Sequence, residues 1–201
     1  MIQRWDKNAL MVLVLAALML LTGLGTRGLN EPDEGRFAEI GREMAGQSNW
    51  MMPHLGGIPH LQKPPLVYWL TALSIRAFGV NEWAARLPSA LAALGTVALV
   101  LHLAGLLFGS GVRWKAGLVL LSSALFFMLA RLITTDMLLT FCITGAVTLF
   151  VHYTVRRKVG ALCFFYLALG LGFLTKGPMA LLVPFCAAIP WAIAHGRHHP
   201  A

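Results

Sequence analysis

The chain has 201 residues, of which 58% are hydrophobic and 12% are charged, and its formal net charge is +8. A typical soluble domain is about 45–50% apolar and about 25% charged, so this composition excludes an ordinary water-soluble domain and a disordered tail. The basic residues stand singly between long apolar runs, whereas a nucleic-acid-binding protein clusters them on a polar domain. We therefore expect a membrane protein that does not bind nucleic acid.

Uncharged segments predict where the chain crosses the bilayer, because a spanning helix needs about 20 mostly apolar residues. They predict an all-α, polytopic membrane protein with about six transmembrane helices, near residues 8–26, 87–109, 116–132, 137–155, 159–175 and 178–195. A long loop over 27–86 separates the first two spans and contains six of the eight acids. Within it, the apolar run 64–75 is too short to span, and we expect an interfacial or re-entrant helix.

Basic residues in the short segments predict the orientation of the spans. They gather in segments 4–7, 113–115 and 156–158 and at Arg197, all on the side of the amino terminus. Because short cytoplasmic loops carry an excess of Lys and Arg, we expect the amino terminus in the cytoplasm. The acidic loop 27–86 would then lie on the outer face.

That loop begins with a predicted amphipathic helix. Phe37, Ile40 and Met44 recur at i, i+3 and i+7, which is typical of a helix lying on the membrane surface. Asp33 would stand in its first turn, where a carboxylate can cap backbone N–H groups or, alternatively, serve as a general base toward an acceptor hydroxyl. The spacing leaves both roles open.

The other acids of this helix are expected to be solvated. Glu34, Glu39 and Glu43 fall at helical spacing from two arginines, Arg36 and Arg42. Exposed ion pairs are the ordinary role of such residues.

Four ionisable residues at the ends of the predicted spans share one side of the membrane in this topology: Asp33, Lys63, Asp136 and Lys176. Lys63 would either anchor the chain among lipid headgroups or clamp a bound phosphate. Two acids and two bases at one interface could form a site for an anionic lipid headgroup. If 64–75 crossed the bilayer, Asp33 would lie opposite Asp136 and the site would not exist.

Four motifs occur in order along the chain: Pro32–Ile40, Lys63–Leu66, Thr134–Asp136 and Leu174–Pro178. Together they closely resemble the bacterial glycosyltransferases related to dolichyl-phosphate-mannose–protein mannosyltransferase, and most nearly the lipid A aminoarabinose transferases. The resemblance runs from the first predicted span to about Pro184. It implies a GT-C fold of which residues 1–201 are the amino-terminal, incomplete part, and such a part need not be active on its own.

The resemblance also implies partners and a location. The sugar donor would be linked to a polyprenyl phosphate, and the acceptor would be lipid A, another glycolipid or another cell-envelope molecule. The protein would lie in the bacterial inner membrane among its lipids, with a periplasmic active site.

Roles for individual residues come from the same resemblance. Asp33, with its neighbour Glu34, would supply the catalytic carboxylates, and Arg36 and Glu39 would shape their loop and help to bind substrate. The remaining substrate-binding residues would be Lys63 and Lys176, which hold the donor phosphate, and Asp136, a second acid lining the cavity.

Two positions depart from the aminoarabinose branch. Gln62 stands where that branch often has an acid, and Phe37 stands where it has a tyrosine. We therefore predict no metal and no cofactor, and the sugar and acceptor stay open. The alternatives are a non-catalytic transporter or flippase module and a degenerate piece of the transferase. Transporter sites carry charges at mid-membrane, whereas these charges stand at span ends.

Overall fold

The computed structural model describes residues 6–30, 32–47, 50–157 and 159–196, and it is almost entirely helical. Its elements in chain order are α1 (Lys7–Leu21), α2 (Asp33–Gly46), β1 (His54–Leu55), β2 (Ile58–Pro59), α3 (Leu66–Phe78), α4 (Glu82–Phe108), α5 (Ser110–Leu121), α6 (Ala124–Ala130), α7 (Thr135–Arg156), α8 (Gly160–Lys176) and α9 (Met179–Gly196). The two strands form a small antiparallel hairpin. The all-α expectation is confirmed.

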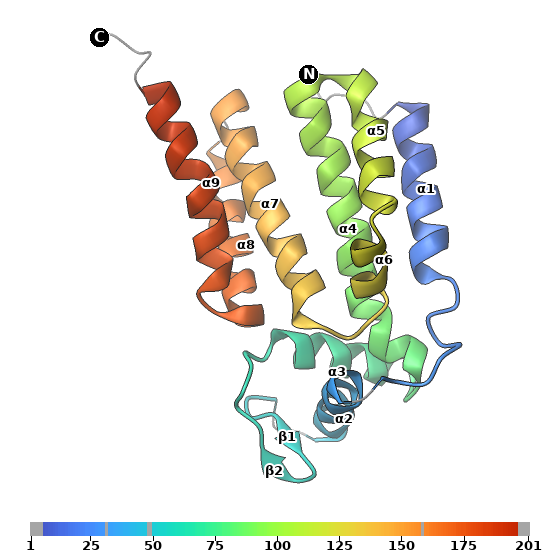
Figure 1. Cartoon of the computed structure of the whole chain (residues 1–201). Coiled ribbons are helices and arrows are strands. Elements are labelled where there is room, and N and C mark those ends of the chain that lie inside the picture. The colour runs from blue at the N-terminus through green and yellow to red at the C-terminus, as the bar shows by residue number, and fades with distance from the viewer. Residues whose placement is uncertain (1–5, 31, 48–49, 158, 197–201) are drawn as a thin grey trace.

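The long helices form a bundle, and the segment between α1 and α4 covers one of its ends (Figure 1). Helices α1, α4, α5, α7, α8 and α9 run roughly along the bundle, whereas α2 and α3 lie across its end together with the hairpin. The α2 and α3 backbones approach closely at Gly41, where a Cβ would lie 2.6 Å from Thr71 Cγ2. A side chain at this position would force the two helices apart.

Two helices, α4 and α7, are long and apolar enough to cross a membrane. The consecutive pair α5 and α6 passes the same test together, but its two halves meet at an angle of 72°. Helices α1, α3 and α8 are apolar and shorter. By length and composition the described residues therefore contain two candidate spans, or three if the bent pair counts as one.

The structure differs from the predicted third span, 116–132, because the helix breaks at Ser122 and Ser123. Ser122 donates its hydroxyl hydrogen to the Val119 carbonyl, and Ser123 starts α6 by accepting a hydrogen bond from the Phe126 N–H. Two serines thus satisfy backbone groups that a continuous helix would pair internally. Charge counting alone does not detect such a break.

The boundaries of the first loop also differ from the prediction of 27–86. Helix α1 ends at Leu21 rather than near residue 26, and Gly23 follows with a φ of +66°. At the other end, Asn81 caps α4 by accepting a hydrogen bond of 2.8 Å from the Ala84 N–H. Arg86, predicted as the last residue of the loop, therefore lies inside α4, where it is buried.

The expected amphipathic helix of the acidic loop is confirmed. Helix α2 buries Phe37, Ile40 and Met44, the three residues of the predicted apolar face. The run 64–75 forms α3, which lies across the end of the bundle instead of spanning it. Asp33 and Asp136 consequently lie at the same end of the molecule.

Candidate functional site

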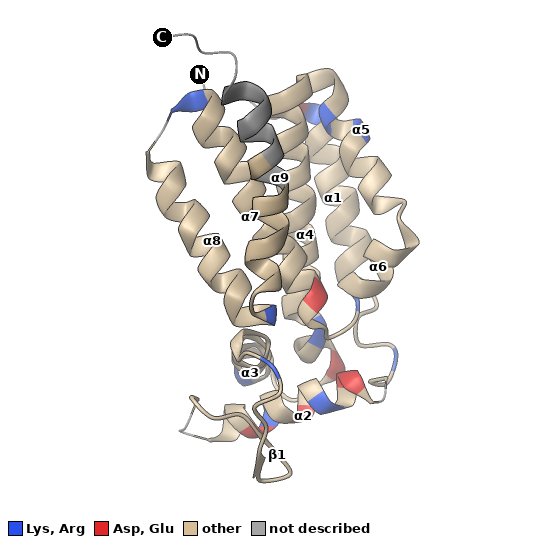
Figure 2. Cartoon of the chain, turned by 60° about the vertical axis from the view of Figure 1, so that its left-hand side comes forward, with Lys and Arg blue, Asp and Glu red and all other residues tan. Residues whose placement is uncertain are grey.

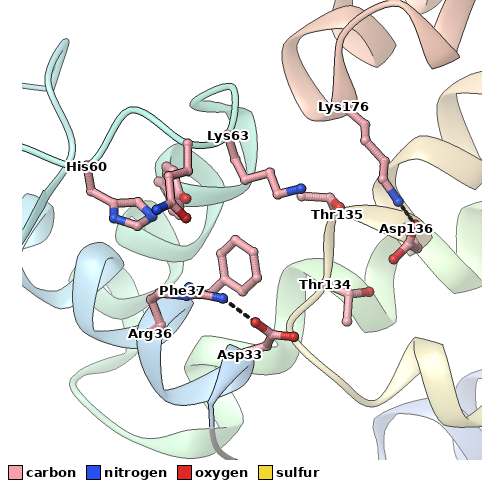
Figure 3. Close-up of a pocket in the computed structure, with 11 residues that line it drawn as sticks. Asp33, Arg36, Phe37, His60, Lys63, Thr134, Thr135, Asp136 and Lys176 are labelled. Carbon is pink, nitrogen blue, oxygen red and sulfur yellow. Dashed lines mark hydrogen bonds and ion pairs between the residues drawn. The ribbon is translucent and has the colours of Figure 1, made fainter.

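A cavity of about 360 Å³ lies at this end of the bundle, where α2, the segment before α3, the α6–α7 connection and the end of α8 meet (Figure 3). It contains five of the seven predicted site residues. Its lining consists of Asp33, Arg36, Phe37, His60, Gln62, Lys63, Tyr68, Thr134, Thr135, Asp136 and Lys176. Three cations and two carboxylates from four separate segments therefore converge on one space.

Asp33 enters the cavity from the first turn of α2. Its carboxylate forms an ion pair with Arg36, one turn further along the helix, and the Asp33 side chain is 65% exposed. Among the described residues the Asp33 carboxylate is hydrogen-bonded to Arg36 and to no backbone N–H of the helix. It therefore does not act as a cap, and it stays accessible from the cavity.

The two lysines reach the cavity from different directions. Lys176, the last residue of α8, forms an ion pair with Asp136 in the first turn of α7. Lys63 extends from the segment before α3 toward Thr135 (Figure 3). Among the described residues Lys63 belongs to no ion pair. Its ammonium group is thus available to an anion from outside the chain.

Two buried hydroxyl groups in the cavity wall were not predicted as site residues. Tyr68 is 1% exposed, and neither its Oη nor Thr134 Oγ1 has a hydrogen-bond partner among the described residues. The Tyr68 ring packs against Phe37, at 5.6 Å between ring centroids, and against His60, at 6.5 Å. A buried polar group without a partner is costly, so these hydroxyls suit a polar ligand. Burial also raises the pKa of Tyr68 above its usual value, although the charge of Arg36 opposes this rise.

The sequence carries only weak signals for these two residues. Tyr68 is an aromatic residue next to Trp69 in an apolar run, which is equally typical of a membrane-interface anchor. Thr134 belongs to the motif Thr134–Asp136, in which Asp136 is the ionisable residue. Spacing alone does not indicate that either residue faces a cavity.

Glu34 does not line this cavity, and the expectation that it lies on a solvated face is wrong. It is 3% exposed and pairs with Arg86, which is 1% exposed. The Arg86 Nε and Nη2 each donate to a Glu34 carboxylate oxygen at 3.0 Å, and the N–H groups of Asn30 and Ile133 donate to the same oxygens at 2.9 and 3.1 Å. Both oxygens are thereby occupied by the chain itself.

Arg86 completes this buried network from the other side. Its Nη1 donates to the carbonyls of Leu24 and Arg27, each at 2.7 Å, and its Nη2 donates to the Gly28 carbonyl at 2.8 Å. Burial by itself would raise the pKa of Glu34, but the hydrogen bonds and the charge of Arg86 outweigh it and hold the pKa below its usual value. The pair ties the loop after α1, the start of α2 and the α6–α7 connection to α4.

Glu39 lies in a second hollow, of about 240 Å³, which α2, α3 and the start of α4 form. Its carboxylate accepts hydrogen bonds of 2.6 and 2.8 Å from Arg42, as the helical spacing predicts. These bonds lower the pKa of Glu39. The structure therefore does not bring Glu39 to the cavity that contains Asp33.

An apolar groove of about 480 Å³ runs beside the polar cavity. Its lining includes Leu70 and Leu73 of α3, Leu91 of α4, and Leu138 and Phe141 of α7. Helices α3 and α7 thus contribute to both spaces. The polar cavity and the apolar groove together suit an amphipathic ligand.

Among the described residues no group of three or more His, Cys, Asp or Glu side chains could hold a metal ion. His60 and Gln62 line the cavity, and neither is part of such a group.

Comparison with known families and proteins gives consistent matches over nearly the whole chain. The family model for dolichyl-phosphate-mannose–protein mannosyltransferase matches residues 62–200. An undecaprenyl phosphate-alpha-4-amino-4-deoxy-L-arabinose arabinosyl transferase from Yersinia enterocolitica is 34% identical over 195 residues, covering 94% of this chain and 35% of the relative. The enzyme of the same name from Edwardsiella ictaluri is 36% identical over 189 residues, covering 92% of this chain and 34% of the relative.

Solved structures agree with these matches. The crystal structure of ArnT from Cupriavidus metallidurans bound to undecaprenyl phosphate superposes with a TM-score of 0.85 at 27% identity, over 94% of this chain and 36% of that protein. Its apo state gives a TM-score of 0.84 at 28% identity, over 92% of this chain and 35% of that protein. The chain therefore spans about a third of the length of the relatives that it matches.

Proposed function

The chain belongs to the dolichyl-phosphate-mannose–protein mannosyltransferase family, and we propose that residues 1–201 form the amino-terminal part of a GT-C membrane glycosyltransferase. The enzyme transfers a sugar from a polyprenyl-phosphate-linked donor to lipid A, another glycolipid or another cell-envelope acceptor. The relatives named above carry undecaprenyl phosphate and an aminoarabinose in their names. That donor class supports a lipid-linked sugar here.

One observation carries the proposal: Asp33 shares a single cavity with Lys63 and Lys176. Transfer requires a base or an orienting group on the acceptor side and positive charge on the leaving-group side. In a displacement at the anomeric carbon, the acceptor oxygen forms a bond to that carbon. At the same time the bond between the anomeric carbon and the phosphate oxygen of the donor breaks. The proton of the acceptor hydroxyl passes to the Asp33 carboxylate, and the electron pair of the broken bond stays on the polyprenyl phosphate.

The cations of the cavity suit that leaving group. Lys63 and Lys176 would stabilise the negative charge that develops on the phosphate, an electrostatic contribution that is often the largest in catalysis. Arg36 orients Asp33 through their ion pair, and Asp136 holds Lys176 in place until a phosphate arrives. Tyr68 and Thr134 offer hydroxyls to the sugar or the acceptor.

The apolar groove gives the isoprenoid chain of the donor a place to lie. Helices α3 and α7 line both spaces, and Leu138 in the groove lies only two positions after Asp136 in the cavity. A donor with its phosphate at the lysines could therefore extend its chain along α3 toward the lipid. This arrangement supports a lipid-linked donor over a soluble nucleotide sugar.

Charge at the two ends of the bundle supports an inner-membrane protein with a periplasmic site. Figure 2 shows most of the acids at the end formed by α2 and α3, whereas Asp6 lies at the opposite end and pairs with Arg113. Lys7 begins α1, Arg113 and Lys115 lie in α5, and Arg156 ends α7, all toward the opposite end. Arg4, Lys158 and Arg197, on which the orientation also relies, lie outside the described residues. By the positive-inside rule the amino terminus is cytoplasmic and the cavity faces the periplasm.

The test is a transfer assay with the full-length enzyme purified from membranes, using undecaprenyl-phosphate-linked sugars and lipid A. Removing a general base typically costs about 10²- to 10⁴-fold in rate, so we expect Asp33→Asn to lower kcat by at least about 100-fold. Asp33→Glu, which keeps the carboxylate, should recover part of the rate. Glu82→Gln is the matched control, because Glu82 is an exposed acid at the same end of the bundle and outside the cavity.

Two outcomes would contradict the proposal. If the Asp33→Asn enzyme kept the wild-type rate, Asp33 would take no part in the reaction. A wild-type enzyme that moves lipids across vesicles and transfers no sugar would favour the transporter alternative.

A further inference from the structure

Another cavity, of about 660 Å³, lies between the end of α1 and α6. It is at the same end of the bundle as the cavity that contains Asp33, but on a different side. Two arginines, Arg27 and Arg131, contribute to its lining, as do the apolar side chains of Met19, Phe127 and Met128. It shares no lining residue with the cavity that contains Asp33. The transfer mechanism proposed above makes no use of it.

Arg131 is held in a fixed position in the wall of this cavity. Its Nη1 donates to the carbonyls of Met19, at 3.0 Å, and Thr22, at 2.7 Å, near the end of α1. Its guanidinium carbon lies 5.3 Å from the centroid of the Phe127 ring, a cation–π distance. A guanidinium has five N–H donors, and Nε and Nη2 have no hydrogen-bond partner among the described residues. Those donors are available to a ligand.

Arg27 adds a second positive charge without a compensating acid. Its side chain is exposed, and none of the residues lining the cavity is acidic. Among the described residues neither Arg27 nor Arg131 forms an ion pair. Burial, together with the nearby charges of Arg27 and Arg86, lowers the pKa of Arg131. Two like charges held near each other favour the binding of an anion between them.

The surroundings restrict which anion fits. Thr22 and Thr26 line the cavity near the arginines, whereas Met19, Phe127 and Met128 belong to two apolar helices of the bundle. In Figure 1 α1 lies at an outer edge of the bundle with α6 beside it, and Figure 2 shows α6 at an edge as well. A ligand here meets charge at the membrane boundary and apolar surface along the helices, as a phospholipid does.

We propose that this cavity binds an anionic membrane lipid, with its phosphate between Arg27 and Arg131 and an acyl chain along α1 and α6. Arg131 supplies the directional hydrogen bonds, because a fixed guanidinium matches the geometry of a phosphate. Arg27 supplies long-range attraction. The site is a lipid site additional to the proposed donor site and does not depend on sugar transfer.

The same buried ion pair positions both sites. Arg86 donates to the backbone carbonyl of Arg27, and Glu34 accepts from the backbone N–H of Ile133, two residues after Arg131. Lipid bound at the two arginines would therefore stiffen the loop after α1 and the α6–α7 connection. Thr134 of that connection, together with Thr135 and Asp136 at the start of α7, lines the other cavity.

The test measures lipid binding to the full-length protein by native mass spectrometry, with dioleoyl phosphatidylglycerol as the anionic probe and dioleoyl phosphatidylcholine as the zwitterionic one. One basic side chain near an anionic lipid contributes about 1 kcal/mol, or about fivefold in affinity. We expect Arg27→Gln to weaken phosphatidylglycerol binding about fivefold and Arg131→Gln to weaken it by at least as much. Phosphatidylcholine binding should change less than twofold in either variant.

Arg76→Gln is the matched control, because Arg76 is an exposed arginine at the end of α3 and lines neither cavity. Arg131→Gln also removes hydrogen bonds to α1 and can affect folding. Arg27→Gln removes only an exposed side chain, so it keeps the test decisive. Asp33→Asn should bind phosphatidylglycerol as the wild type does, which separates this site from the proposed transfer reaction.

Three results would overturn the proposal. Unchanged phosphatidylglycerol binding in Arg27→Gln would exclude the paired arginines. Equal affinity for phosphatidylcholine would exclude a site for net negative charge. Competition by glycerol phosphate at the same concentration as the lipid would identify a soluble phosphate ester as the ligand and exclude the role of the acyl chain.

Discussion

Asp33 and Glu34 are neighbours in the chain, but the first turn of α2 gives them opposite surroundings. Successive residues of a helix point about 100° apart, so one carboxylate turns into the protein and the next turns toward the cavity. Glu34 is buried and accepts four hydrogen bonds from the chain. Asp33 is mostly exposed and pairs with Arg36 alone among the described residues. Glu34, whose carboxylate is fully hydrogen-bonded to the chain, stabilises the structure. Asp33, whose carboxylate is accessible, is free to contact a substrate.

The cations show the same division. Arg86 is buried, and its three guanidinium nitrogens are all engaged with Glu34 or with backbone carbonyls. Lys176 pairs with Asp136 in a partly exposed site. Exposed ion pairs typically contribute less than about 1 kcal/mol, so an incoming phosphate can replace Asp136 at little cost. The buried pair of Glu34 and Arg86 thus stabilises the end of the bundle at which the exchangeable pair of Asp136 and Lys176 lies.

The largest expected effect comes from breaking the buried pair. Removing one partner of a buried ion pair typically costs about 3–5 kcal/mol, because it leaves an uncompensated charge. We expect Arg86→Ala to lower the free energy of unfolding by this amount and to reduce the yield of folded protein. Thermal unfolding in detergent measures it, with Arg76→Ala as the exposed control. An Arg86→Ala protein as stable as the wild type would show that the pair is not structural.

A smaller effect, with a characteristic pH dependence, is expected for Glu34→Gln. Glutamine keeps an acceptor oxygen and loses the charge, and a hydrogen bond to a charged group is worth about 1.5–3 kcal/mol. Because the folded state lowers the pKa of Glu34, its stabilisation is present above the ordinary pKa of 4.5 and is lost as the pH falls through the lower folded value. Glu34→Gln should therefore be less stable than the wild type at neutral pH and should approach it in acid.

Glu39→Gln is the control for that pH dependence. The pKa of Glu39 is also lowered, through its hydrogen bonds with Arg42, but the pair is largely exposed and contributes little. Its stability difference from the wild type should stay below about 1 kcal/mol at every pH. If Glu34→Gln lowered the free energy of unfolding by the same amount at every pH, the charge of Glu34 would not be what stabilises the fold.

The smallest effect is expected for the open pair in the cavity. A double-mutant cycle with Asp136→Asn and Lys176→Met should give a coupling energy below about 1 kcal/mol in the free energy of unfolding. The measurement is again thermal unfolding in detergent, without a lipid-linked donor. A coupling above about 2 kcal/mol would show that this pair is as structural as the pair of Glu34 and Arg86, and the contrast between the two regions would fail.

The sequence predicted much of the candidate site because its residues lie at span ends, where topology alone brings them to one side. Asp33, Lys63, Asp136 and Lys176 all line one cavity. Glu34 and Glu39, which received site roles from the family resemblance alone, do not line this cavity. Helical spacing places an acid on a face of its own helix, but it does not show which face a distant helix covers. Arg86 lies 52 positions from Glu34, and no local pattern joins them.

Composition and the spacing of charges were enough to establish a helical membrane protein, an amphipathic helix from Asp33 and a set of boundary charges on one side. These features depend on the water–lipid boundary and on helical periodicity, which act on each segment independently. The break at Ser122 depends on local hydrogen bonds, which charge counting does not detect. Tertiary structure alone decided the burial of Glu34 with Arg86 and the separate cavities at Lys63 and at Arg131. Those features arise because segments far apart in the chain desolvate one another, and desolvation is a property of the packed molecule.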